Sequence, residues 1–190
     1  MNLFFAAACN TRAILPGSLR YIRSDVPVHV SPEEKEKLLA ENIRTVVDLR
    51  KAEECAAKPC PLEADERFCY LHLSVTGGNA IPKSRAMVPV SYLKMVDEQM
   101  EHILDVICHA GSNVLYFCNA GKDRTGVVSA LLLRRAGMPE EYIIEDYLRS
   151  GENLAPQLQA FARQNPGLDV GIITPQAEYM RQFLRELPQL

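Results

Sequence analysis

Residues 113–133 read NVLYFCNAGKDRTGVVSALLL. The first part, 113–117, is an apolar run with the length of a buried strand, and the last part, 127–133, has the composition of a buried helix. A short loop of small and charged residues, 118–126, joins the two. This order predicts a strand, a tight loop and a helix. We therefore expect an α/β fold, with a mostly parallel central sheet flanked by helices and a helical C-terminal third.

The loop brings one nucleophile and one fixed cation close together in the sequence. A compact loop that enters a helix turns backbone N–H groups inward, and the helix N-terminus adds partial positive charge, so the loop is expected to bind phosphate. Arg124 can donate two parallel hydrogen bonds to such an anion. The same field favours the thiolate form of Cys118, which is the form that attacks phosphorus. The predicted phosphate-binding residues are Asn119, Ala120, Gly121, Lys122, Asp123 and Arg124.

This strand, loop and helix resemble the signature of the cysteine-dependent protein tyrosine phosphatase superfamily. The ending Gly-Lys-Asp-Arg-Thr-Gly at 121–126 is similar to that of an atypical dual-specificity branch found in bacteria and fungi. Other segments similar to the same branch are 10–12 with 19–25, 45–50 with Glu53 or Glu54, and 145–148. The resemblance spans most of the chain. It implies hydrolysis of phosphate monoesters through a phosphocysteine intermediate, with phosphotyrosine as the first substrate class and phosphoinositides or inositol phosphates as others.

The resemblance also assigns catalytic roles within the loop. Cys118 is expected to attack the phosphorus, while Arg124 and the loop amides stabilise the spreading charge. Thr125 is expected either to donate a hydrogen bond to the Cys118 sulfur or only to cap the helix. Lys122 either raises the local positive potential or is a solvated lysine.

Two features depart from the superfamily pattern. Phe117 stands where a histidine usually precedes the nucleophile, and the segment from Phe68 to Val96, which should carry the proton donor, contains no Asp or Glu. Asp48 and Asp123 are the remaining candidates for the general acid. For Asp48 the alternative is a salt bridge that orders Arg50 or Arg124.

Three arginines outside the loop are candidates for the rim of the site. If the opening segment folds over the loop, as the resemblance implies, Arg12, Arg23 and Arg50 lie at its mouth. Each of them alone is otherwise an ordinary surface or structural arginine.

The rest of the chain is expected to continue the strand and helix pattern. Helices are predicted from Pro32 to about Ala40 and at 51–57, 90–110, 139–148, 154–164 and 175–187, and strands at 43–49 and 68–75. The loop 76–89 exceeds the length of about 12 residues beyond which loops are usually functional or disordered, so we expect a flap over the site.

Composition limits the other function classes. The 190 residues suit one domain, 1–190, and the net charge of -3 gives no basic surplus for nucleic acid. No run approaches the roughly 20 apolar residues of a membrane span, so no integral membrane association is expected. Residues 1–9 resemble a lipoprotein cleavage box but are better explained as a first strand.

Cysteine and histidine usage favours a reduced, metal-free enzyme. Cys118 must stay reduced to react, which indicates a cytoplasmic location for a chain with six cysteines. The four histidines show no metal-ligand spacing, and chemistry through a thiolate requires no metal, so neither metal nor cofactor is expected.

Two rival functions remain open on the sequence. Phe117 and the missing acid fit a catalytically silent module that binds phosphorylated ligands. A persulfidated Cys118 that transfers sulfur would use a similar anion-binding loop, although such a loop would not need the ending at 122–125.

Overall fold

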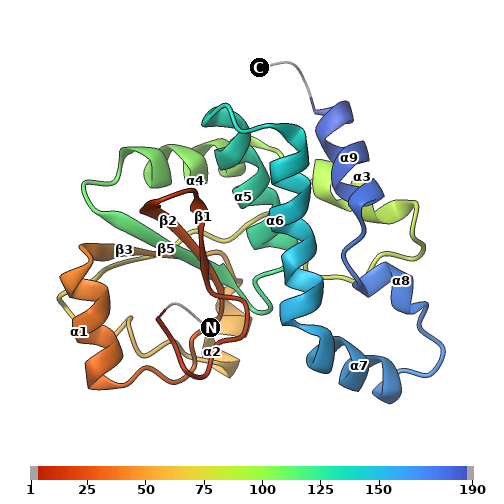
Figure 1. Cartoon of the computed structure of the whole chain (residues 1–190). Coiled ribbons are helices and arrows are strands. Elements are labelled where there is room, and N and C mark those ends of the chain that lie inside the picture. Colours follow the sequence, from red (N-terminus) through yellow and green to blue (C-terminus); the bar gives the residue numbers. More distant parts are fainter. Residues whose placement is uncertain (1–3, 188–190) are drawn as a thin grey trace.

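A computed structural model describes residues 4–187 and shows helices on both faces of a five-stranded sheet (Figure 1). The strand order is β1-β2-β5-β3-β4. Only β1 is antiparallel to its neighbour, and β2, β5, β3 and β4 run parallel. The bounds are Arg12–Leu15 for β1, Ser18–Asp25 for β2, Ile43–Asp48 for β3, Cys69–His72 for β4 and Asn113–Cys118 for β5. The predicted α/β class with a mostly parallel sheet is confirmed.

The helices connect the strands and then form the C-terminal third. Their bounds are Pro32–Ala40 for α1, Ala52–Ala57 for α2, Met87–Leu93 for α3, Glu98–His109 for α4, Asp123–Arg135 for α5, Glu140–Asn153 for α6, Ala155–Gln164 for α7, Val170–Ile173 for α8 and Ala177–Glu186 for α9. In Figure 1, α1 and α2 lie on one side of the sheet, and α4, α5 and α6 lie on the other.

Each face of the sheet has its own apolar core, because the buried strands present side chains alternately to both sides. Leu38 of α1 packs with Val46 and Phe117 on one face. The larger core on the other face includes Tyr116 and Ile103. The strand β5 contributes to both cores, so its end, where Cys118 lies, is held from two sides.

Several predicted elements need correction. The single helix predicted at 90–110 is two helices, because the Asp97 side chain accepts a hydrogen bond from the Met100 backbone N–H at 2.9 Å and so starts α4 anew. The strand predicted at 68–75 is shorter, and α8 was not predicted. The first strand predicted at 1–9 is wrong where the chain is described. Residues 4–9 form no strand, Phe4 and Phe5 pack into the core beside α1, and residues 1–3 lie outside the described residues.

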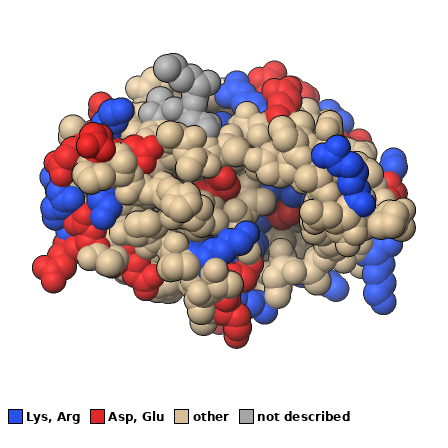
Figure 2. Space-filling view, turned by 90° about the horizontal axis from the view of Figure 1, so that it is seen from below, with Lys and Arg blue, Asp and Glu red and all other residues tan. Residues whose placement is uncertain are grey.

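The surface offers no broad field of one charge on the side seen in Figure 2, where basic and acidic side chains alternate. Within residues 4–187, none of the helices combines the length and the apolar character that crossing a bilayer requires.

Candidate active site at the end of β5

Cys118 is the last residue of β5, and α5 begins at Asp123, so a four-residue loop separates the nucleophile from the helix. This loop lies at the carboxyl end of the parallel strands, where α/β sheets place their ligands. Gly121 has a φ of 62°, and a Cβ atom at this residue would lie 2.4 Å from the backbone oxygen of Ser24. Only glycine fits this close approach between the loop and β2.

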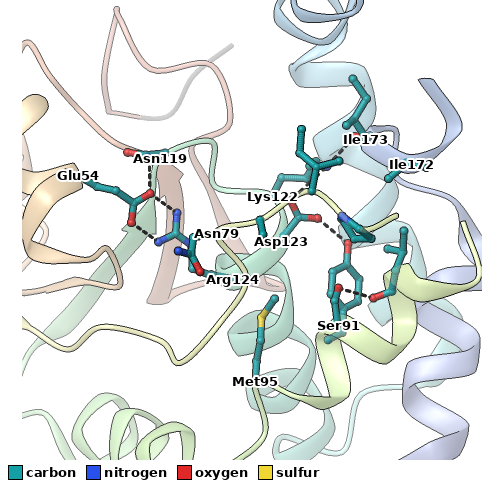
Figure 3. A pocket seen from close by; sticks show the side chains of 16 residues that line it. Glu54, Asn79, Ser91, Met95, Asn119, Lys122, Asp123, Arg124, Ile172 and Ile173 are labelled. Atoms are coloured by element: carbon teal, nitrogen blue, oxygen red, sulfur yellow. Dashed lines mark hydrogen bonds and ion pairs between the residues drawn. The ribbon is translucent and has the colours of Figure 1, made fainter. Parts of the chain in front are cut away.

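Arg124 is held by a carboxylate from a different element. Its Nη1 and Nη2 atoms donate to the two oxygens of Glu54 at 2.6 and 2.8 Å, and Glu54 lies on α2 (Figure 3). Asn119 donates to the same carboxylate. The pKa of Glu54 is lowered, first by its hydrogen bonds with Arg124 and against the opposing effect of burial. The guanidinium is therefore fixed beside the loop before any anion binds.

A cavity of about 220 Å³ opens over the loop. Its floor carries Lys122, Asp123 and Arg124, and its sides come from the loop after β4, from α3 and from α8. The residues that form these sides include Gly78, Asn79, Ala80, Ile81, Pro82, Tyr92, Met95, Ile172 and Ile173. The segment predicted to be a flap thus lies against the predicted phosphate-binding residues.

Asp123 faces this cavity and is held in place by a tyrosine. Tyr92 donates its hydroxyl to Asp123 Oδ1 at 2.6 Å, and the Tyr147 hydroxyl lies 2.8 Å from that of Tyr92. Lys122 Nζ lies 3.2 Å from Asp123 Oδ2 and donates to the backbone oxygen of Ile173 at 2.6 Å. Lys122 is thus buried and bound rather than solvated.

Thr125 lies directly after Arg124 in the first turn of α5 and is fully buried. Its hydroxyl oxygen has no hydrogen-bond partner within residues 4–187. A buried hydroxyl without a partner costs free energy unless a ligand or a reacting group satisfies it.

Asp48 has a different environment from Asp123. It is fully buried, accepts two hydrogen bonds from the Arg50 guanidinium at 2.8 and 2.6 Å, and accepts a third from the Tyr70 hydroxyl at 2.7 Å. Burial alone would raise the pKa of Asp48, but the hydrogen bonds from Arg50 and Tyr70 outweigh it and lower the pKa. The salt bridge with Arg50 is the alternative that the sequence had left open.

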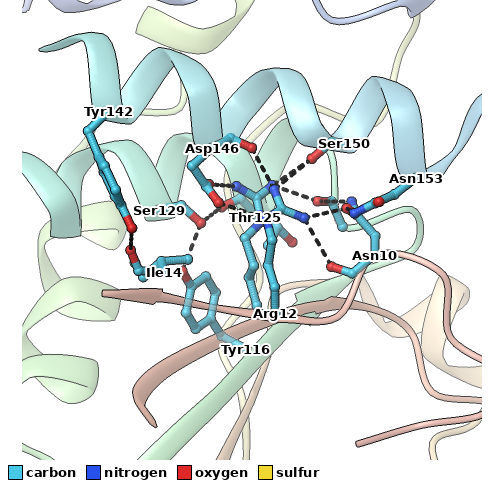
Figure 4. A network of polar contacts seen from close by, with 12 residues as sticks. Asn10, Arg12, Ile14, Tyr116, Thr125, Ser129, Tyr142, Asp146, Ser150 and Asn153 are labelled. Atoms are coloured by element: carbon cyan, nitrogen blue, oxygen red, sulfur yellow. Dashed lines mark hydrogen bonds and ion pairs between the residues drawn. The ribbon is translucent and has the colours of Figure 1, made fainter. Parts of the chain in front are cut away.

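The three predicted rim arginines do not line the mouth of the cavity, so that prediction is corrected. Arg12 pairs with Asp146 of α6 (Figure 4), Arg23 pairs with the same carboxylate, and Arg50 pairs with Asp48. Arg23 also donates to the backbone oxygen of Gly121 at 2.7 Å. Arg23 and Arg50 are buried and Arg12 is partly buried, and all three compensate the charge of a buried carboxylate, Asp146 or Asp48.

Sequence reasoning missed the residues that hold the loop from behind. Asn10 donates its side-chain amide to the Gly121 oxygen at 2.8 Å, and Asp146 orients two arginines. Glu54 was noted only as part of a resembling segment. Its position in the first turn of α2, shortly after β3 ends at Asp48, was the available signal for a partner of Arg124.

The chain is similar in sequence to known tyrosine phosphatases. A sequence model of the tyrosine phosphatase family matches residues 11–189. The tyrosine-protein phosphatase of Nostoc commune is 29% identical over 160 residues, which cover 79% of this chain and 54% of the relative. The triple specificity protein phosphatase PtpB of Mycobacterium tuberculosis is 48% identical over 59 residues, which cover 31% of this chain and 21% of the relative.

Among solved structures, TpbA of P. aeruginosa matches with a TM-score of 0.42 and 18% identity, over 92% of this chain and 96% of that chain. The chain spans about half the length of the Nostoc relative.

Proposed function

We propose, since the chain belongs to the tyrosine phosphatase family, that it hydrolyses phosphate monoesters through a phosphocysteine formed at Cys118. The observation that carries this proposal is the position of Arg124. Glu54 fixes its guanidinium with two hydrogen bonds at the start of α5, a few residues after the nucleophile. A guanidinium held this way meets an incoming phosphate without reorganisation, which is the main source of electrostatic catalysis.

The steps follow from the residues at the loop. The Cys118 sulfur attacks phosphorus, and the ester oxygen leaves with its bonding electrons while Arg124 and the loop amides stabilise the equatorial oxygens. Water then attacks the phosphocysteine and releases phosphate. The unpartnered Thr125 hydroxyl supports a role as hydrogen-bond donor to the departing sulfur.

We assign the general acid to Asp123. Its carboxylate lines the cavity and is 34% exposed, whereas Asp48 is buried and occupied by Arg50. Tyr92 orients Asp123 through its hydrogen bond at 2.6 Å. A positioned acid that reaches the leaving oxygen contributes about 10²–10⁴ in rate.

Phosphotyrosine in proteins is the proposed substrate class. The sides of the cavity include the apolar side chains of Ile81, Pro82, Ile172 and Ile173, which suit the ring of an aryl phosphate. Phosphoinositides and inositol phosphates are the other candidates.

We also propose that residues 1–190 act as one phosphatase domain, because both apolar cores share a single sheet. We also propose a cytoplasmic location. The proposed reaction requires Cys118 as a free thiol or thiolate, and the cytoplasm keeps cysteines reduced. In the described part of the chain, all six cysteines are free.

The test is steady-state hydrolysis of p-nitrophenyl phosphate by the purified chain. Turnover should disappear in Cys118→Ser and persist in Cys69→Ser, which changes an exposed cysteine on β4. Tight binding of a phosphate ester without turnover would instead identify a silent binding module, and turnover of thiosulfate would identify sulfur transfer. Parallel assays with phosphopeptides, phosphoinositides and inositol polyphosphates then separate the substrate classes.

A further inference from the structure

A second hollow, of about 500 Å³, is lined by residues that the proposed reaction does not use. Cys55 of α2, His72 at the end of β4 and Glu63 face this hollow together with Arg50. Next to it lies Asp48 at the end of β3. One oxygen of Asp48, the sulfur of Cys55 and one ring nitrogen of His72 all lie within 4.8 Å of one another.

We propose that Asp48, Cys55 and His72 form a binding site for a zinc-class divalent cation, with the fourth coordination position open to the hollow. One thiolate, one imidazole and one carboxylate make a ligand set typical of Zn²⁺. A zinc site with three protein ligands leaves one coordination position free for water or another ligand. Zinc sites that only stabilise a fold have four protein ligands and no free position.

The two separations measured from the Cys55 sulfur fit tetrahedral coordination. The Cys55 sulfur lies 3.7 Å from His72 Nδ1 and 3.5 Å from Asp48 Oδ2. Ligand bonds of about 2.3 Å to sulfur and about 2.0–2.2 Å to nitrogen or oxygen, at the tetrahedral angle, separate the ligand atoms by roughly 3.6 Å. Both separations from the sulfur therefore match those around a bound ion.

His72 is already oriented as a metal ligand. Its Nε2 atom lies 2.8 Å from Glu63 Oε1, so Glu63 holds the ring proton on Nε2 and leaves the Nδ1 lone pair directed at Cys55. A carboxylate behind a metal-binding imidazole is the usual support for such a ligand.

Asp48 has the same kind of support. Arg50 Nη2 and the Tyr70 hydroxyl donate to Asp48 Oδ2, the oxygen that lies 3.5 Å from the Cys55 sulfur, and Arg50 Nε donates to Oδ1, so the carboxylate is fixed in its orientation.

The decisive experiment is a cobalt titration of the full chain carrying Cys118→Ser, which removes the competing active-site sulfur. We expect one Co²⁺ per chain, with a thiolate-to-cobalt charge-transfer band and the visible bands of a tetrahedral site, both lost on adding Zn²⁺. Cys55→Ala and His72→Ala should abolish the bands, and Glu63→Gln should weaken binding about 10–100-fold. Cys69→Ser changes an exposed cysteine three residues before His72 on β4 and should leave the titration unchanged.

Several results would overturn the site. They are the absence of the charge-transfer band, its persistence in Cys55→Ala, or its equal loss in Cys69→Ser. Because His72 is exposed, His72→Ala keeps the test valid if Cys55→Ala folds poorly, and circular dichroism checks both variants. Zinc should also protect Cys55 from iodoacetamide, measured by peptide mass spectrometry. The cobalt spectrum and the protection from iodoacetamide do not depend on phosphatase activity. A negative result for the cation site is therefore distinguishable from a negative result for the proposed phosphatase function.

Discussion

Asp123 and Asp48 have the same side chain but opposite surroundings, and their roles should separate in leaving-group experiments. We predict that Asp123→Asn lowers kcat on phenyl phosphate by about 10²–10⁴ and lowers it less on dinitrophenyl phosphate, because a better leaving group needs less protonation. Steady-state rates on the two esters provide the measurement. Asp105→Asn, at a largely exposed position on α4, is the matched control.

We expect a different effect from Asp48→Asn than from Asp123→Asn. Asp48→Asn should reduce stability, since it removes the charge that compensates buried Arg50, without a preference for poor leaving groups. If Asp48→Asn shows the leaving-group dependence and Asp123→Asn stays within a few-fold of wild type, the assignment of the acid is reversed.

Glu54 should affect catalysis through its pair with Arg124. Glu54→Gln weakens a charged hydrogen-bonded pair, and hydrogen bonds to charged groups contribute about 1.5–3 kcal/mol, so kcat/KM should fall by about 10–100-fold. The Ki for vanadate should rise in parallel, because both report phosphate binding by Arg124. The neighbouring Glu53→Gln, in the same turn of α2, serves as control. Equal kinetics in the two variants would remove Glu54 from the site.

The loop between β5 and α5 is the element on which the site depends, and Gly121 is its least replaceable residue. Gly121→Ala puts a side chain into the left-handed region and against β2, so we predict destabilisation of at least about 1–2 kcal/mol and loss of most phosphatase activity. Urea denaturation and kcat/KM provide the measurements. Gly111→Ala, where a Cβ meets nothing within 4 Å, should stay within about 0.5 kcal/mol of wild type. Similar losses in both variants would contradict this account of Gly121.

The boundaries of elements depend on caps as much as on apolar periodicity. The helical stripe predicted at 90–110 continues through the break between α3 and α4, so periodicity alone could not show the new start at Asp97. The helix predicted from Pro32 was confirmed because Ser31 and Glu34 form a capping box there.

Asp146 of α6 connects distant parts of the molecule through two arginines. It pairs with Arg12 of β1 and with Arg23 of β2, and Arg23 in turn donates to the loop residue Gly121. Asp146→Asn leaves Arg12 and Arg23 without their shared carboxylate, and loss of one partner of a buried pair costs about 3–5 kcal/mol. Urea denaturation should show this loss at neutral pH. Asp169→Asn, which breaks an exposed pair with Arg85, should cost no more than about 1 kcal/mol.

The effect of Asp146 should also depend on pH. Burial alone would raise its pKa, but attraction by Arg23 and Arg12 outweighs burial and holds the pKa below its ordinary value of 3.8. When folding lowers the pKa of a carboxyl group, that group stabilises the folded protein at any pH above its pKa in the unfolded chain. The stabilisation is lost as the pH falls through the pKa of the group in the folded protein. The stability difference between wild type and Asp146→Asn should therefore stay constant above about pH 5 and shrink in more acidic solution. A difference that grows on acidification would refute this.

Much of the fold, and the loop at 118–126 at the centre of the candidate site, depend on residues that are close in sequence and could therefore be predicted. The strand, loop and helix at 113–133, the α/β class and the family were predicted from local patterns and are confirmed. The roles of Cys118, Arg124 and Thr125 stay predictions that the geometry supports. Local reasoning succeeds here because nine consecutive residues supply both the nucleophile and its anion-binding loop.

The partners of these residues come from distant parts of the chain. The parallel order of β3, β4 and β5 aligns the carboxyl ends of these strands, which brings Glu54 to Arg124 and Cys55 to His72. The pair of Arg12 and Asp146 instead joins β1 to α6. A pattern of spacing along the chain cannot encode such pairs, since each depends on which elements become neighbours. Long-range packing therefore pairs the arginines expected at the rim with Asp146 and Asp48, and it brings together the side chains of the proposed cation site, which no local motif indicates.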